Sequence, residues 1–332
     1  MARRRGGKAK AKRMKKSEPV QRYLYYNLPV GNAGASGNSF YLDLAAGVSA
    51  LNRRLYRQGR TYHVANASVV DTSGKLTSAR FCTLPDLWTT HKGWSLMFNA
   101  WKDQRARTLE NSPSYVTGRW ADFKVWMSEQ HFQEALAAET DKKGGIMPVL
   151  SDMDAVPTGE WLISDISTVL NGAEYANRQL WMMGDHNIAG SPTGQGFGVL
   201  HSLQEMLQQP PESPVLPADF KDSVIMGMNP STGADLNDDI LENIADDNDQ
   251  PPYDKTTVIG ASQTATNSQS VAVREVGWAS GAKGIASLPT MGFPVPLGLL
   301  ECRFTSDGDT TNVGLMLELV PGSYKGVHAE AF

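Results

Sequence analysis

Strict alternation of apolar and polar positions is clearest near the end of the chain. In residues 312–320 every second side chain is large and aliphatic, and residues 299–304 repeat the pattern. Successive side chains of a strand point to opposite faces of a sheet, so alternation is typical of antiparallel strands with one buried face. We predict two strands here, joined into a hairpin by a turn at 305–312. Their predicted buried side chains are Leu300, Cys302, Phe304, Val313, Leu315, Leu317 and Leu319.

Shorter stretches of the same character predict a mainly β fold. A second hairpin is expected where 60–71 and 75–84 flank Thr72, Ser73 and Gly74. The spacing of the strands is irregular, the connections are long, and no alternating βαβ pattern is present. We therefore expect a jelly-roll-like antiparallel sandwich with a helical insertion and long loops. The remaining predicted strands are 23–28, 38–45, 159–170, 178–184 and 270–278.

A change of period marks the middle of the chain. Between 86 and 140, apolar residues recur at helical spacing, which predicts an insertion with two amphipathic helices. The stripe of the first helix is Trp94, Met97, Phe98 and Trp101, and that of the second, over 119–139, is Trp120, Phe123 and Met127. A further helix is predicted at 199–209, before a Pro pair. Residues 210–254 are rich in Pro, Asp and Asn, which predicts a long acidic surface loop.

Tryptophan is concentrated in the predicted insertion. Five of the eight tryptophans lie between 88 and 126. Core packing is the expectation for two or three of them, and buried aromatic anchors at subunit contacts are the alternative. The candidate interface residues are Trp94, Trp101, Trp120 and Trp126.

Charge divides the chain into two parts of opposite sign. Nine of the first sixteen residues are Lys or Arg and none is acidic, whereas the whole chain has a net charge of −4. Without the nine, 22 basic residues face 35 acidic ones, a charge of −13. Residues 1–20 are therefore expected to be a disordered arm that neutralises phosphates without reading bases. Its candidate nucleic-acid-binding residues are Arg3, Arg4, Arg5, Lys8, Lys10, Lys12, Arg13, Lys15 and Lys16.

Motifs for catalysis or metal binding are missing from the sequence. No phosphate-binding loop, serine-hydrolase turn or His-Glu-x-x-His motif occurs, and the Gly-rich stretch at 190–198 lacks the required Lys. The six histidines lack metal-ligand spacing, and the Asp-rich loop does not match an EF-hand. We expect no enzyme activity, no cofactor and no metal, with Ca²⁺ binding by the Asp-rich loop as an open alternative. Cys82 and Cys302, far apart in the sequence, are expected to be small buried side chains. No apolar run is long enough to span a membrane.

A basic arm at 1–16 followed by a β-rich acidic body resembles the capsid proteins of small circular Rep-encoding single-stranded DNA viruses (circovirus-like). The resemblance implies one jelly-roll capsid domain over 21–332, many copies closing a shell, and an arm that contacts the packaged genome. Single-stranded DNA is the expected genome, with RNA as an open alternative. The expected location is the virion, and the host nucleus during assembly if the arm also acts as a nuclear localisation signal. The alternative is a non-capsid nucleic-acid-binding protein, or an enzyme acting on nucleic acid, with a basic tether.

Overall fold

The computed structural model describes most of the chain outside the arm and the longest connections. The described residues are 19–31, 38–71, 75–110, 122–137, 146–149, 157, 159, 161–168, 176–187, 196–208, 258–261, 270–277, 286–306 and 311–332. The predicted acidic loop at 210–254 and the arm up to residue 18 lie outside these residues.

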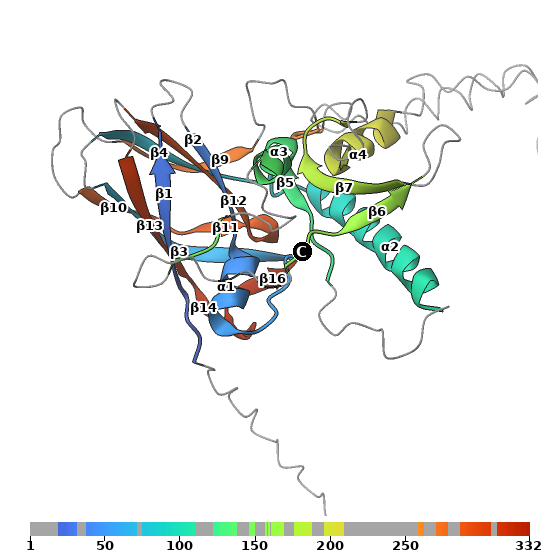
Figure 1. The fold of residues 1–332 in the computed structure, drawn as a ribbon, viewed down its shortest axis with the longest axis horizontal. Helices are drawn as coiled ribbons and strands as arrows, with labels where there is room; N and C mark the ends of the chain where they lie inside the picture. The colour runs from blue at the N-terminus through green and yellow to red at the C-terminus, as the bar shows by residue number, and fades with distance from the viewer. Residues whose placement is uncertain are drawn as a thin grey trace, which may run out of the picture.

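Two antiparallel sheets form a sandwich (Figure 1). The first has the order β1-β13-β3-β10 and the second β2-β12-β4-β9. The strands of the first sheet are β1 (Tyr23–Val30), β3 (Arg60–Asp71), β10 (Ala286–Thr290) and β13 (Thr311–Leu319). Those of the second are β2 (Asn38–Asp43), β4 (Leu76–Thr83), β9 (Val271–Gly277) and β12 (Leu299–Ser306). The chain changes sheet between β1 and β2, β2 and β3, β3 and β4, β9 and β10, β11 (Phe293–Val295) and β12, and β12 and β13. This winding is that of a jelly roll, so the predicted fold class is confirmed.

The sandwich core lies between the two sheets and matches the predicted alternation. All seven side chains predicted to be buried in 299–319 have exposed fractions of 0–1%, whereas Met316 between them is 38% exposed. They join one continuous cluster with Leu24, Tyr26 and Leu28 of β1. Both cysteines are free and buried, Cys82 in β4 and Cys302 in β12, as expected.

The two predicted hairpins are wrong. β12 pairs with β2 and β4, and β13 pairs with β1 and β3, so these consecutive strands lie in opposite sheets. The same holds for β3 and β4. A strand with one buried face shows the same alternation whether its successor lies beside it or across the core. The pattern therefore fixed which side chains point inward but not which strands pair.

Short elements complete the sandwich. Helix α1 (Leu44–Asn52) includes the last two residues of the strand predicted at 38–45, so that prediction is wrong at this end. The helix begins after Asp43, whose Oδ1 accepts the Ala46 N–H at 3.0 Å. Such capping by Asp is a common helix start. β11 (Phe293–Val295) and β16 (Ala329–Ala331) pair with β3, and β14 (Pro321–Gly322) pairs with β15 (Gly326–Val327). A 3-10 turn, η4 (Pro296–Gly298), leads into β12.

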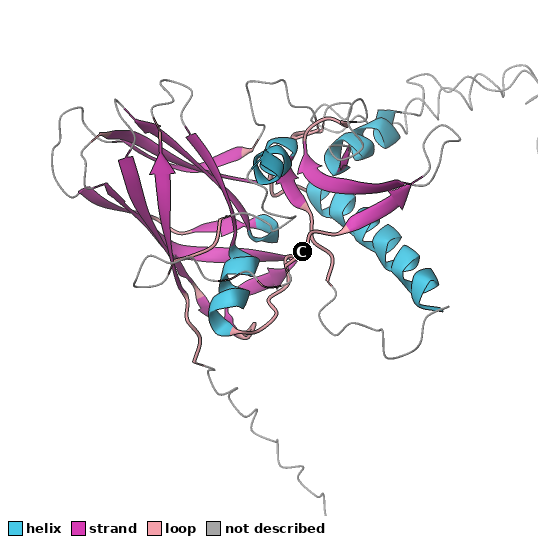
Figure 2. Cartoon of the chain, viewed as in Figure 1, coloured by secondary structure: helices cyan, strands magenta, loops and turns pink. Residues whose placement is uncertain are grey.

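The insertion between β4 and β9 is larger than predicted and contains its own sheet. Helices gather there while strands dominate the sandwich (Figure 2). Its sheet has the order β5-β7-β6, with β8 also on β7, and the β5–β7 and β7–β8 pairings are parallel. The elements are α2 (Trp88–Glu110), β5 (Trp126–Ser128), α3 (Glu129–Ala137), β6 (Asp165–Thr168), β7 (Ala176–Met183), β8 (Gly196–Gly198) and α4 (Val199–Gln208).

Two predictions for residues of the insertion are wrong. The helix predicted over 119–139 exists only as α3, because the preceding backbone has tertiary partners instead: the N–H of Val125 donates to Gln58 Oε1 at 2.7 Å. The strands predicted at 159–170 and 178–184 belong to the insertion sheet and not to the sandwich. The helices predicted around Trp94 and at 199–209 are confirmed as α2 and α4.

The insertion packs against the outer face of the second sheet. The ring of His131 in α3 stacks on Tyr41 of β2, with ring centroids 4.7 Å apart. The chain end adds a second attachment, since the ring of Phe332 stacks on His91 of α2 at 4.1 Å. None of the described helices is long and apolar enough to cross a membrane.

Candidate nucleic-acid interface at the root of the basic arm

The first described residues fix where the arm joins the sandwich. Gln21 and Asn52, the last residue of α1, exchange two hydrogen bonds: the Gln21 N–H donates to Asn52 Oδ1 at 2.8 Å, and Asn52 Nδ2 donates to the Gln21 carbonyl at 3.0 Å. The Leu319 N–H donates to the Arg22 carbonyl at 3.0 Å. The arm therefore meets the body at the end of the sandwich where α1 and β14 lie (Figure 1).

A basic turn follows α1 at this same end. Arg53, Arg54 and Arg57 are exposed and lie in the connection between α1 and β3. Arg53 closes the helix in the left-handed region, with φ 50° and ψ 40°, and its N–H donates to the Ser49 carbonyl. Glycine is usual at such a cap because a Cβ there costs free energy. The chain instead places a long cation at this position.

A fourth basic residue comes from the connection between β14 and β15. Lys325 is exposed, has a φ of 50°, and donates from Nζ to the Leu55 carbonyl, while Tyr56 Oη donates to the Lys325 carbonyl at 2.8 Å. Tyr324 beside it accepts from the Arg57 N–H at 3.1 Å. The Arg60 guanidinium lies 3.8 Å from the centroid of the Tyr324 ring, a cation–π contact.

We name Arg53, Arg54, Arg57 and Lys325 the junction cluster. Three segments build it: 19–30, 44–62 and 319–329. None of them contains an acidic residue. One acidic neighbour of the cluster is Asp122, whose Oδ1 is 3.9 Å from Arg57 Nε. Summed cations on one surface attract polyanions and raise their association rate. The cluster thus extends the positive charge of the arm onto the folded body.

The sequence-predicted site residues divide between described and undescribed parts of the chain. All nine arm residues and Trp120 lie outside the described residues. Trp94 and Trp126 are 9% and 1% exposed and pack inside the chain, in line with the core packing expected for two or three of the tryptophans, and their interface role stays a prediction. Trp101 is half-buried against Phe98 and Phe123, and its interface role stays a prediction.

Sequence reasoning missed the junction cluster, although a signal was present. Residues 52–60, NRRLYRQGR, contain four Arg and no acidic residue. This run is short beside the arm, and only the fold brings Lys325 to it.

A buried polar network joins the sandwich to the insertion. Asp43 Oδ2 accepts from Gln58 Nε2 at 3.2 Å and from Trp161 Nε1 at 3.1 Å, and Gln58 Nε2 also donates to the Val125 carbonyl. Burial raises the pKa of Asp43 to about 6, more than these hydrogen bonds and the nearby Lys124 lower it. This carboxyl group supports the contact between the two regions and is remote from solvent.

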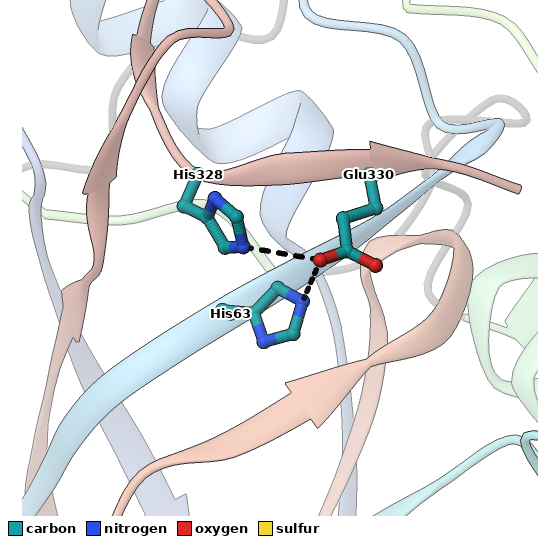
Figure 3. A group of neighbouring side chains, drawn as sticks. All are labelled: His63, His328 and Glu330. Atoms are coloured by element: carbon teal, nitrogen blue, oxygen red, sulfur yellow. Dashed lines mark ion pairs between the residues drawn. The ribbon is translucent and has the colours of Figure 1, made fainter.

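Two groups of His and Glu side chains were not expected from sequence spacing. One joins His63, His328 and Glu330 near the chain end (Figure 3), and the other joins His186, His201 and Glu205 in the insertion. In each group one donor atom per residue lies within 4.8 Å of the others. In the first group His63 is 265 positions from His328, which explains why spacing alone did not reveal it, whereas the second group lies within residues 186–205.

Comparison of the chain with protein-family models, with curated proteins and with solved structures finds no match.

Proposed function

We propose that this chain is a viral capsid protein that assembles into an icosahedral shell and packages nucleic acid through its basic arm. A jelly roll alone supports many functions, so the fold is not the main support. The observation that carries the proposal is the junction cluster, which places exposed cations on the folded body at the point where the arm leaves it.

The charge distribution gives this proposal a physical basis. The arm and the junction cluster are both positively charged, whereas the chain without the arm carries −13. Phosphates are attracted to these positive charges, and the acidic remainder repels them from other surfaces. Because the arm has no aromatic residue, binding depends on phosphate neutralisation and is independent of base sequence. Single-stranded DNA is the proposed genome, with RNA as the alternative, and many copies of the chain are the proposed shell.

The first test is particle formation by the purified full chain. Electron microscopy should show closed particles tens of nanometres across that contain nucleic acid. Deletion of residues 2–16 should leave the sandwich folded and yield particles with little nucleic acid. Small oligomers that bind nucleic acid without forming particles would overturn the capsid proposal in favour of a non-capsid binding protein.

The second test addresses the junction cluster with matched variants. Arg53→Gln/Arg54→Gln/Lys325→Gln removes three exposed cations at the junction, and Lys92→Gln/Lys102→Gln/Arg107→Gln removes three from α2. Each phosphate contact to a single strand contributes roughly 0.7 to the slope of log K against log salt, so the junction variant should flatten the slope by about 2. The α2 variant should change it little. An equal effect of both variants would mean that only net charge matters.

A further inference from the structure

The group formed by His63, His328 and Glu330 is held by the backbone. His63 lies on β3, and Glu330 lies on β16, which pairs with β3. The two histidines are fixed by one residue, because the Val320 N–H donates to the His63 carbonyl at 2.9 Å and the Val320 carbonyl accepts from the His328 N–H at 2.7 Å. Both imidazoles and the carboxylate point toward a common centre (Figure 3).

The distances among the three donor atoms suit a small divalent cation. Glu330 Oε1 is 3.3 Å from His328 Nε2 and 3.9 Å from His63 Nε2. Ligands at about 2.0–2.1 Å from a tetrahedral ion are roughly 3.3 Å apart, so small side-chain rotations close the site. Two imidazoles and one carboxylate match a known zinc ligand set that leaves a fourth position for water. Glu330 and His328 are exposed enough to admit the ion, at 64% and 41% of the side chain.

One ligand atom of the group also lacks a competing partner. His63 Nε2 is a buried atom without a hydrogen-bond partner among the described residues. A bond to a metal ion would satisfy this buried polar atom.

The second group, in the insertion, differs in a way that makes it a control. The Gly198 N–H donates to His186 Nδ1 at 3.1 Å, which places the ring proton on Nε2, facing Glu205 Oε2 at 3.1 Å. That nitrogen has no lone pair for a metal. In the first group, no described N–H donates to Nδ1 of either histidine, so Nε2 is able to be the unprotonated nitrogen.

We propose that His63, His328 and Glu330 bind a zinc-class divalent cation that clips the C-terminal strand β16 to β3. This inference is independent of the proposed function. The ion would cross-link residues that are 265 positions apart in the chain. Cross-links that close long loops are expected to stabilise the folded state the most.

Zinc titration of the full chain without a histidine tag tests the site. Isothermal titration at pH 7.5 should show one strong Zn²⁺ site per chain. Glu330→Gln, an exposed and nearly isosteric change, should weaken binding at least tenfold, and His328→Ala at least a hundredfold. The matched change His201→Ala in the second group should leave the affinity unchanged. Circular dichroism would verify that each variant is folded.

A second measurement follows the protection of strand β16 instead of the binding of the metal. Amide hydrogen exchange of residues 329–331 should slow when Zn²⁺ is added to the wild-type chain, and should not respond in Glu330→Gln. The proposal is overturned if the folded wild-type chain binds no zinc. It is also overturned if His201→Ala abolishes the strong site, or if Glu330→Gln and His328→Ala retain it.

Discussion

The sandwich and the insertion bury their strands in different ways. In β13 the inward side chains join the core between the two sheets, and the next position outward, Met316, is 38% exposed. In β7, Leu180 and Met182 join one apolar cluster with residues of α2 and α4, while Trp181 between them joins another with Phe132 of α3. Helices thus cover both faces of the insertion sheet, whereas much of the first sandwich sheet has one covered face.

This difference explains why the two regions have different sequence patterns. A strand with one covered face alternates, whereas a strand covered on both faces has a continuous apolar run. The run LWMM in β7 is of the second kind. The number of covered faces, and not strand propensity, therefore determines whether a strand can be recognised by alternation in the sequence.

The largest expected effect comes from neighbouring positions of β13. Leu315→Asp places an unpaired charge in the sandwich core, at a cost comparable with the roughly 5–15 kcal/mol stability of a whole domain. We expect no soluble folded protein. Met316→Asp, one residue later on the outer face, should fold and should unfold at nearly the wild-type denaturant midpoint. Similar yields of both variants would contradict the assigned inward face.

In β7, by contrast, neighbouring positions should be equally sensitive. Trp181→Ala and Met182→Ala each remove a side chain that is 0% exposed, on opposite faces of the strand. Large-to-small changes in a core cost about 2–5 kcal/mol, so both variants should be destabilised by that amount in urea unfolding. A neutral result for either residue would show that one face of the insertion sheet is less well packed than the structure indicates.

Asp43 tests the contact between the two regions through pH. Its folded pKa of about 6 exceeds the ordinary aspartate pKa of 3.8, so the folded state binds the proton more tightly. The stability from this proton is full below pH 4 and is lost as the pH rises through 6. Between pH 4 and 8 the loss is on the order of 2 kcal/mol. Asp43→Asn should lack this component, so the difference in unfolding free energy between the two proteins should change with pH by that amount. A constant difference would contradict the raised pKa.

The smallest expected effect separates charge from stability at the junction cluster. Arg53 and Lys325 both have a φ of 50°, where a side chain costs about 1–2 kcal/mol and glycine does not. Arg53→Gly should therefore be neutral or raise stability by up to about 1 kcal/mol in thermal unfolding, although the proposed function predicts weaker nucleic-acid binding. Arg54→Gly, at a position without a positive φ, should lower stability by about 0.4–1 kcal/mol, because glycine gives the unfolded chain more conformational entropy. Destabilisation by both would indicate that the Arg53 side chain makes a structural contact.

Much of the sandwich could be predicted from sequence, because its inward positions alternate strictly. Pairing could not, since β12 and β13 show the same pattern across the core as they would side by side. Helix α1 was missed although Asp43 followed by Leu-Ala-Ala is a recognisable start. The segment before α3 was misassigned because Val125 pairs with Gln58, a partner 67 positions away.

The candidate sites were less accessible to sequence reasoning. The arm follows directly from composition, but the junction cluster needs the contact between 53–57 and Lys325 that only the fold provides. The group around His63 depends on β16 lying beside β3. Contacts of this kind are set by tertiary structure, and no local pattern encodes them.

The pairing of β1 also determines when the body is completed during synthesis. Within the described chain β1 pairs only with β13, and Tyr23 meets Glu318, 295 positions later. At about 5–20 residues per second, roughly 15–60 s separate the emergence of these two strands from the ribosome. The insertion lies between them in the sequence, so all of it emerges from the ribosome before β13 is available to pair with β1. The basic arm is therefore exposed to the polyanions of the cell before the jelly roll that anchors it exists.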